Sequence, residues 1–474
     1  MTYQQLKGWV LAGVLGLTGC QSEPTVPTGS NVPSTPVPSS PRESTPPDGD
    51  SSSDEGGPVE SSPPDAGTAS DAGTASNTET PSPTPPASST PSPLECPPLE
   101  TRSVQWARLF PSRVSALATD AQARILAFTN RDTPQLFDPQ GQPLWSGPGL
   151  SDQVGQQVDL NGASVAPATG TIYGWGSRRN EWTDFPDAAA YRLDAVGQQP
   201  ALVTLGGDET VLGPFLEDLE GNLLGLQRTS HGSALRYTGH AGTSWSLTSV
   251  HLDDEAPGVF HYIHSALDAQ GHVIALAMLH DTLLFQGQTF GSPGQSQLVV
   301  LKLSAQGELI WARQLPTDPY TQPQQLGVSS SGQILVMGNV AGTLDWPTGP
   351  VHATTWTVFL FSLDAEGRPG WLQTFTPAEG YTLAVSASGA SLVFSTQGQT
   401  SSVHEYGSEG CLRWTQAWPT QGTEGQLTSL RTAWSGEDAV LAGSFSGTVH
   451  VGSGSEPPLH SDTPAGFVLK LGQP

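Results

Sequence analysis

Short apolar runs alternate with polar turns along residues 96–474. Runs such as Val299–Leu303 and Val358–Leu363 have the length and side chains of strands, and Asp, Ser and Gly in the intervening segments supply turn conformations at low steric cost. The pattern predicts an all-β domain built from consecutive hairpins.

A glycine followed four residues later by a tryptophan recurs in this domain, at Gly141 and Trp145, Gly307 and Trp311, Gly367 and Trp371, and Gly410 and Trp414. Each copy predicts a turn after which the tryptophan opens the next strand. These turns alternate with a second glycine turn, and the alternation gives seven units of about 40 to 60 residues, the spacing of four-stranded β-propeller blades. The units are expected to begin near Val114, Val158, Val211, His264, Gln325, Thr382 and Leu427. A β-sandwich or β-helix is the alternative.

The two ends of the domain complement each other. The last strand, Phe467–Leu471, has no tryptophan strand after it, and Val104–Phe110 resembles Ile310–Leu315 but has no blade before it. We expect the first strand to complete the last blade, which would remove an open sheet edge. The sequence thus predicts a seven-bladed β-propeller closed by its N-terminal strand and preceded by a disordered tether.

The first apolar run, Trp9–Leu17, follows Lys7 and is too short to span a bilayer. It leads into Leu17-Thr18-Gly19-Cys20, which resembles the lipobox of bacterial lipoproteins. The resemblance implies a signal peptide over residues 1–19, acyl chains such as palmitate on Cys20, and a membrane-anchored protein outside the cytoplasm. Gln21 in place of Asp favours the outer membrane or cell surface. A buried free thiol at Cys20 is the alternative.

Residues 20–95 consist mostly of Ser, Pro, Thr, Gly, Asp, Glu and Ala. Such a segment has too little apolar surface to offset the chain entropy lost on folding, so it predicts a disordered tether. The remaining residues, 96–474, are long and apolar enough to form a core.

The net charge of −26 and the presence of three lysines argue against binding to nucleic acid. With Cys20 assigned to lipid, Cys96 and Cys411 remain, and outside the cytoplasm such a pair favours a disulfide. Two separate buried thiols are the alternative.

Residues 442–471, with Phe445-Ser446-Gly447-Thr448 and Phe467-Val468-Leu469-Lys470-Leu471, resemble the β-propeller repeats of secreted and lipid-anchored bacterial proteins. The likeness is good in blades four, five and seven. The Gly-x-x-x-Trp element is also similar to the tryptophan-docking motif of quinoprotein propellers, which include quinone-dependent dehydrogenases and non-catalytic scaffolds. Those dehydrogenases commonly carry a vicinal disulfide, and this sequence has no adjacent cysteines, so the resemblance favours the non-catalytic type without a cofactor.

Motifs of hydrolases, nucleotide-binding loops and zinc sites are absent from the sequence. Five histidines cluster in the fourth unit, and we interpret them as hydrogen-bonded or solvated rather than as a metal site: His251, His261, His264, His272 and His280. Five tryptophans lie off the repeat position, where packing is favoured over stacking on a sugar: Trp175, Trp182, Trp346, Trp356 and Trp434.

These observations predict a monomeric, lipid-anchored, non-catalytic β-propeller that binds or scaffolds a protein or glycan at the cell envelope. The alternative is a hydrolase or lyase of an envelope polymer, with carboxylates converging in the central funnel. Two or more buried carboxylates with raised pKa values in that funnel would favour the enzyme.

Overall fold

The structure is a computed structural model that describes residues 96–129, 132–155, 157–178, 187–203, 211–229, 232–239, 244–250, 259–318, 320–375, 379–397, 399–419, 425–451 and 458–472. The chain divides into Met1–Ser88 and Ser89–Pro474, and all described residues belong to the second unit. The expected signal peptide and tether lie outside the described residues. No helix within the described ranges has both the length and the hydropathy needed to cross a bilayer.

The described domain is all-β apart from the five-residue helix α2 (Leu150–Val154). Four of its sheets have four antiparallel strands each. The first two are β2 (Ala116–Thr119), β3 (Ile125–Thr129), β4 (Thr133–Phe137) and β5 (Pro143–Ser146), and β6 (Val158–Val165), β7 (Ile172–Arg178), β8 (Asp187–Leu193) and β9 (Ala201–Leu202). The other two are β22 (Glu379–Val385), β23 (Ser391–Gln397), β24 (Thr400–Tyr406) and β25 (Leu412–Pro419), and β26 (Gln426–Ser435), β27 (Asp438–Val449), β28 (Leu459–Gly472) and β1 (Ser103–Phe110).

The remaining strands form one sheet of 12 strands. Its parts are joined by single residue pairs, Ser249 with Phe260 and Thr317 with Leu344. These weak joins divide it into three groups: β10 (Val211–Glu217), β11 (Leu223–Thr229), β12 (Gly232–Thr238) and β13 (Ser244–Val250); β14 (Val259–Leu267), β15 (Val273–Phe285), β16 (Gln288–Leu303) and β17 (Leu309–Thr317); and β18 (Gln322–Val328), β19 (Ile334–Leu344), β20 (Val351–Leu363) and β21 (Pro369–Phe375).

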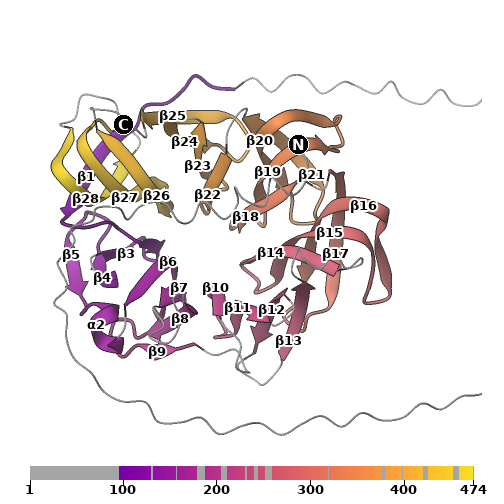
Figure 1. The fold of residues 1–474 in the computed structure, drawn as a ribbon, viewed down its shortest axis with the longest axis horizontal. Helices are drawn as coiled ribbons and strands as arrows, with labels where there is room; N and C mark the ends of the chain where they lie inside the picture. Colours follow the sequence, from indigo (N-terminus) through magenta and orange to yellow (C-terminus); the bar gives the residue numbers. More distant parts are fainter. Residues whose placement is uncertain are drawn as a thin grey trace, which may run out of the picture. The chain divides into compact units, whose positions relative to one another are not determined.

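The first strand of each group contacts the first strand of the next, in the order β2, β6, β10, β14, β18, β22 and β26, and β26 contacts β2. In Figure 1 the groups of this domain follow one another around a common centre. Two expected unit starts, Val158 and Val211, are the first residues of β6 and β10. The other expected starts lie inside or just before a first strand.

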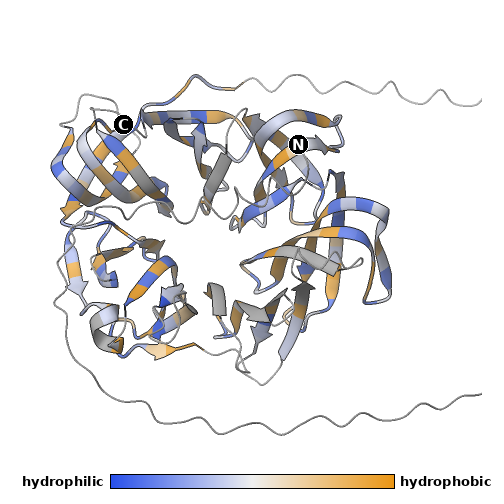
Figure 2. Ribbon diagram, viewed as in Figure 1, coloured by the Kyte–Doolittle hydropathy of each residue, from blue (hydrophilic) through white to orange (hydrophobic). Residues whose placement is uncertain are grey.

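The hydrophobic core lies between neighbouring groups. One cluster joins Leu276 and Val300 to Val336 and Phe359, and all four side chains are fully buried. Figure 2 shows hydrophobic and hydrophilic residues interspersed along the strands. Because the middle strands of a group are covered on both faces, the last residues of β16 and β28 are buried without a strict alternation, and each run is apolar except for one lysine, Lys302 or Lys470.

In three groups the hairpin formed by the second and third strands continues beyond the length of the other hairpins. Beyond a β-bulge, β15 and β16 continue to pair from Thr282 to Phe285, and β19 and β20 continue in the same way from Gly342 to Leu344. The β27–β28 hairpin has the same extension from Gly447 onward. These are the three units in which the sequence most resembles the bacterial propeller repeat.

The N-terminal segment is tied to two groups. Cys96 and Cys411 form a disulfide that spans 315 residues, which confirms the predicted pairing. Strand β1 then pairs antiparallel with β28, from Ser103 opposite Gly472 to Phe110 opposite Gly466. Because Cys411 precedes β25, the segment that leads into β1 joins the β22–β25 group to the β26–β28 group.

Candidate functional site

Tryptophan side chains fix each group of strands against its neighbour. In five places a Cβ added to a turn glycine would lie within 3 Å of an indole ring, so the ring occupies the space that a side chain would need: Trp106 on Gly141, Trp145 on Gly197, Trp245 on Gly307, Trp311 on Gly367 and Trp371 on Gly410. At four of these five places, those of Trp106, Trp245, Trp311 and Trp371, the indole N–H also donates to a backbone carbonyl of the same turn. The repeat therefore packs between groups, as the sequence indicated.

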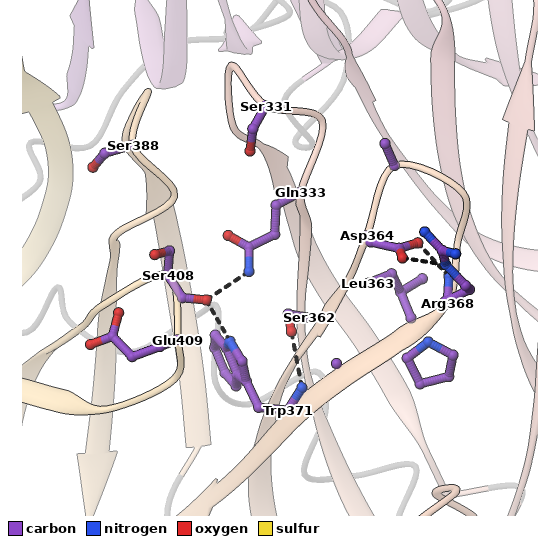
Figure 3. Close-up of a pocket in the computed structure, with 13 residues that line it drawn as sticks. Ser331, Gln333, Ser362, Leu363, Asp364, Arg368, Trp371, Ser388, Ser408 and Glu409 are labelled. Carbon is purple, nitrogen blue, oxygen red and sulfur yellow. Dashed lines mark hydrogen bonds and ion pairs between the residues drawn. The ribbon is translucent and has the colours of Figure 1, made fainter. Parts of the chain in front are cut away.

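A recess lies between the β18–β21 and β22–β25 groups, at the turns that contain two of these glycines. Its volume is about 470 Å³, within the range of small-molecule pockets. It is lined by Ser331, Gln333, Ser362, Leu363, Asp364, Ala365, Arg368, Pro369, Gly370, Trp371, Ser388, Ser408 and Glu409. Figure 3 shows that these side chains come from turns and strand ends of both groups.

Two hydrogen bonds hold one wall of the recess. Gln333 Nε2 and Trp371 Nε1 both donate to the carbonyl oxygen of Ser408, each over 2.7 Å (Figure 3). On the opposite side the backbone N–H of Trp371 donates to Ser362 Oγ over 3.1 Å. The Gln333 amide and the Ser362 hydroxyl group are therefore held by hydrogen bonds within the protein itself.

The charged groups at the recess are already paired. Arg368 contacts both Asp364 and Glu366, and Arg413 contacts Glu409 over 3.1 Å. A fourth carboxylate, Glu437, accepts a hydrogen bond from the Ser388 hydroxyl over 2.7 Å, so two guanidinium groups face four carboxylates. Such a site disfavours an anionic ligand.

The first strands carry a second set of polar contacts. His264 Nε2 donates to the Pro323 carbonyl over 3.1 Å, and burial lowers the pKa of His264 to about 4, so the ring is neutral near pH 7. Farther round, Arg113 pairs with Asp159 over 2.7 Å, and both side chains are about half exposed. These contacts link neighbouring groups of strands near their first strands, so we interpret them as contacts that hold the groups together.

Asp132 is a buried carboxyl group beside β6. Burial raises its pKa to about 6, although hydrogen bonds from the Ser115 hydroxyl and the Leu160 N–H act to lower it. Neighbouring cations and hydrogen bonds instead lower the pKa of Asp268 and Asp364, so these three carboxyl groups do not share one environment.

The histidines of the fourth unit make separate contacts. His272 Nδ1 pairs with Asp268 over 2.9 Å, and His280 Nδ1 bonds the Ser296 hydroxyl over 3.0 Å. His251 lies outside the described residues, and the pairing of β14 with β15 has a register shift between His261 and His264. Within the described ranges no three His, Cys, Asp or Glu side chains are grouped as metal ligands.

The off-repeat tryptophans that the structure describes contribute to packing. Trp346 and Trp434 are buried in the core, and Trp175 packs over Gly162. Trp356 is partly exposed, and Trp182 lies outside the described residues, as does Cys20.

The recess could not be predicted from the sequence, because it depends on two small residues, Ser362 and Gly370. These residues become informative only when the repeats are aligned by strand register.

No family model matches the chain, and no curated protein matches its sequence. Among solved structures, the chain is similar to the β-propeller domain of Cps50 (Swd1) from Myceliophteria thermophila, with 12% identity, a TM-score of 0.46, and coverage of 78% of this chain and 99% of that one. It is also similar to the Dos1 propeller, with 10% identity, a TM-score of 0.41, and coverage of 78% and 94%. A third similarity is to Raptor from Chaetomium thermophilum, with 8% identity, a TM-score of 0.47, and coverage of 79% and 30%.

Proposed function

We propose that residues 96–474 form a seven-bladed β-propeller whose last blade is completed by the N-terminal strand. The groups of four strands, and the contacts that lead from β2 through each first strand and back to β2, support this arrangement. Trp106 of β1 also docks on Gly141, as Trp311 of β17 docks on Gly367. Strand β1 thus takes the place of a fourth strand at the β26–β28 group.

The propeller acts as a non-catalytic binding or scaffolding module for a protein or glycan at the cell envelope, as a monomer and without a cofactor. The observation that carries this proposal is the recess between the β18–β21 and β22–β25 groups, whose polar walls are held by Gln333 and Trp371. A rigid, preformed site binds with a small entropic cost.

The test is affinity capture with the full-length protein purified from gently solubilised membranes. Bound peptides and glycans are then identified by mass spectrometry. We expect a saturable, stoichiometric partner. Recovery of no partner, together with turnover of an envelope polymer by the same protein, would contradict the binding module.

The module is anchored by acyl chains on Cys20 at the outer membrane or cell surface, with residues 20–95 as its tether. The lipobox-like sequence before Cys20 supports this, and a disulfide between Cys96 and Cys411 suits a compartment outside the cytoplasm. A Cys20→Ala variant should move from the membrane fraction to the soluble fraction and lose labelling by palmitate. Unchanged fractionation and labelling would refute the anchor.

A further inference from the structure

The repeat shows why a recess opens at the β18–β21 group. In all seven groups a residue near the end of the third strand pairs with one near the start of the second strand. These third-strand residues are Leu136, Arg192, Tyr237, Lys302, Ser362, Glu405 and Lys470. Two groups have a lysine at this position and one has an arginine, whereas the β18–β21 group has a serine, the smallest of the seven side chains.

The lysines at this position fill the space between turns. Lys470 Nζ lies 3.0 Å from Asp438 and 3.0 Å from the carbonyl oxygen of Pro139, which belongs to the turn of the neighbouring group. Lys302 Nζ pairs with Asp268 over 2.9 Å. Ser408 takes the place of Pro139 in the β22–β25 turn, and there the Gln333 amide reaches the carbonyl instead. The shorter Ser362 side chain therefore leaves room beside Ser408.

A second small residue lies beside Ser362. Gly370 precedes Trp371, whereas the residue before the repeat tryptophan is Leu144, Ile310 or Arg413 in the other copies. A Cβ at Gly370 would lie 2.4 Å from Ser362 Oγ, so the serine hydroxyl group occupies the space that a side chain at position 370 would need. Both small residues line the recess.

The lining of the recess indicates the chemistry of its ligand. The Ser362 hydroxyl group accepts from the Trp371 N–H and can still donate, and the Ser388 hydroxyl group donates to Glu437 over 2.7 Å and can still accept. The Ser331 hydroxyl group contacts Ser329 Oγ over 2.9 Å and keeps further hydrogen-bonding capacity, as does the Gln333 amide. Apolar surface comes from Pro369 and Trp371. Because the nearby cations are matched by carboxylates, the recess suits an uncharged ligand with many hydroxyl groups and apolar C–H faces.

We propose that this recess binds a neutral saccharide unit of a glycan. The serine hydroxyls and Gln333 hydrogen-bond its hydroxyl groups, while Pro369 and Trp371 contact its C–H faces. The inference rests on the proposed binding function and names the ligand class of the same site.

The test uses the full-length protein in detergent on an array of immobilised neutral and acidic oligosaccharides, with binding constants for the bound glycans measured by titration calorimetry. A Ser362→Lys variant introduces the residue found at this position in two other groups and should reduce affinity at least tenfold. Ser146→Lys, at an exposed position on β5, is the matched control and should bind like the unaltered protein. Ser331→Ala removes one hydroxyl group without filling the recess, and it should reduce affinity by about two- to tenfold.

Binding to acidic oligosaccharides alone, binding to none, or equal binding by the protein and its Ser362→Lys variant would overturn the inference. If the Ser362→Lys variant does not fold, unchanged glycan binding by Ser331→Ala would overturn the inference instead. Absence of glycan binding, together with equal capture of a protein partner by the unaltered protein and Ser362→Lys, would refute the saccharide recess and leave the binding module standing. Absence of glycan binding together with absence of a captured partner would refute the saccharide recess and the binding module alike.

Discussion

Gly367 and its counterparts at Gly141, Gly307 and Gly410 each combine two constraints on the side chain. Their backbones have positive φ angles between +74° and +88°, and an indole ring lies where a Cβ would be. The first constraint is local, since L-residues rarely adopt this conformation. The second is tertiary, because the ring comes from the neighbouring group of strands.

Gly367→Ala should separate these constraints when it is compared with Gly287→Ala. Both glycines have similar φ values, +74° and +77°, but nothing lies within 4 Å of a Cβ at Gly287, whereas Trp311 lies 2.8 Å from one at Gly367. We expect Gly287→Ala to lower the free energy of unfolding by about 1 to 2 kcal/mol. Gly367→Ala should lower it by about 1 to 3 kcal/mol more. Equal losses in urea denaturation would show that the tryptophan dock tolerates a methyl group.

Asp132 should make stability depend on pH. Its pKa rises from an ordinary value of 3.8 to about 6 because burial disfavours the charge. Its contribution is therefore fully present below pH 4 and is lost as the pH rises to about 6, a change of about 3 kcal/mol at 1.36 kcal/mol per pKa unit.

Asp132→Asn removes this titration and keeps a residue that tolerates the positive φ angle. Relative to the unaltered protein, the variant should gain about 3 kcal/mol in free energy of unfolding between pH 4 and pH 7. Urea denaturation at the two pH values measures the change. A stability difference that is independent of pH would mean that Asp132 is ionised throughout this range in the folded protein.

The segment before β1 contains a buried ion pair. Arg102 and Glu405 are each 1% exposed, and two guanidinium nitrogens of Arg102 donate to the two carboxylate oxygens of Glu405. Arg102 also donates to the Leu471 carbonyl over 3.3 Å, and its guanidinium carbon lies 5.6 Å from the centre of the Trp434 ring. The segment therefore contacts both the β22–β25 and β26–β28 groups.

Glu405→Gln should cost about 3 to 5 kcal/mol in free energy of unfolding, because it leaves the charge of Arg102 buried without its partner. The double variant Arg102→Met with Glu405→Leu should lose less free energy of unfolding than Arg102→Met alone or Glu405→Leu alone, since it removes both charges. A double-mutant cycle in guanidinium chloride measures the coupling. Additive losses would show that the two side chains act independently.

Elements that depend on local pattern could be predicted from the sequence. The Gly-x-x-x-Trp turns occur where the spacing indicated, because Asp138 and Asp364 accept backbone N–H groups within their own turns. The partners of His264 and Arg102 could not be predicted, because they are 59 and 303 residues away. The recess was hidden for the same reason, since its walls come from two groups.

At the scale of the whole domain, the disulfide should stabilise the fold by restricting the unfolded chain. It closes a loop that spans 315 residues, for which a chain-entropy model gives on the order of 5 kcal/mol, and native disulfides commonly contribute about 2 to 5 kcal/mol. The Cys96→Ser, Cys411→Ser double variant should lose that amount in thermal or chemical unfolding. An unchanged unfolding midpoint would mean that the contacts of β1 with β28 are sufficient.

The same bond changes what happens when the chain is cut. A protease that cleaves one exposed loop anywhere between Cys96 and Cys411 makes two fragments that remain covalently joined. The cut protein should therefore run as a single band on a non-reducing gel and as two bands after reduction. If Cys20 carries the anchor, the part of the domain beyond the cut also stays attached to the membrane. Release of domain fragments from the membrane then requires cleavage in the tether, cleavage after Cys411, or a reductant as well as a protease.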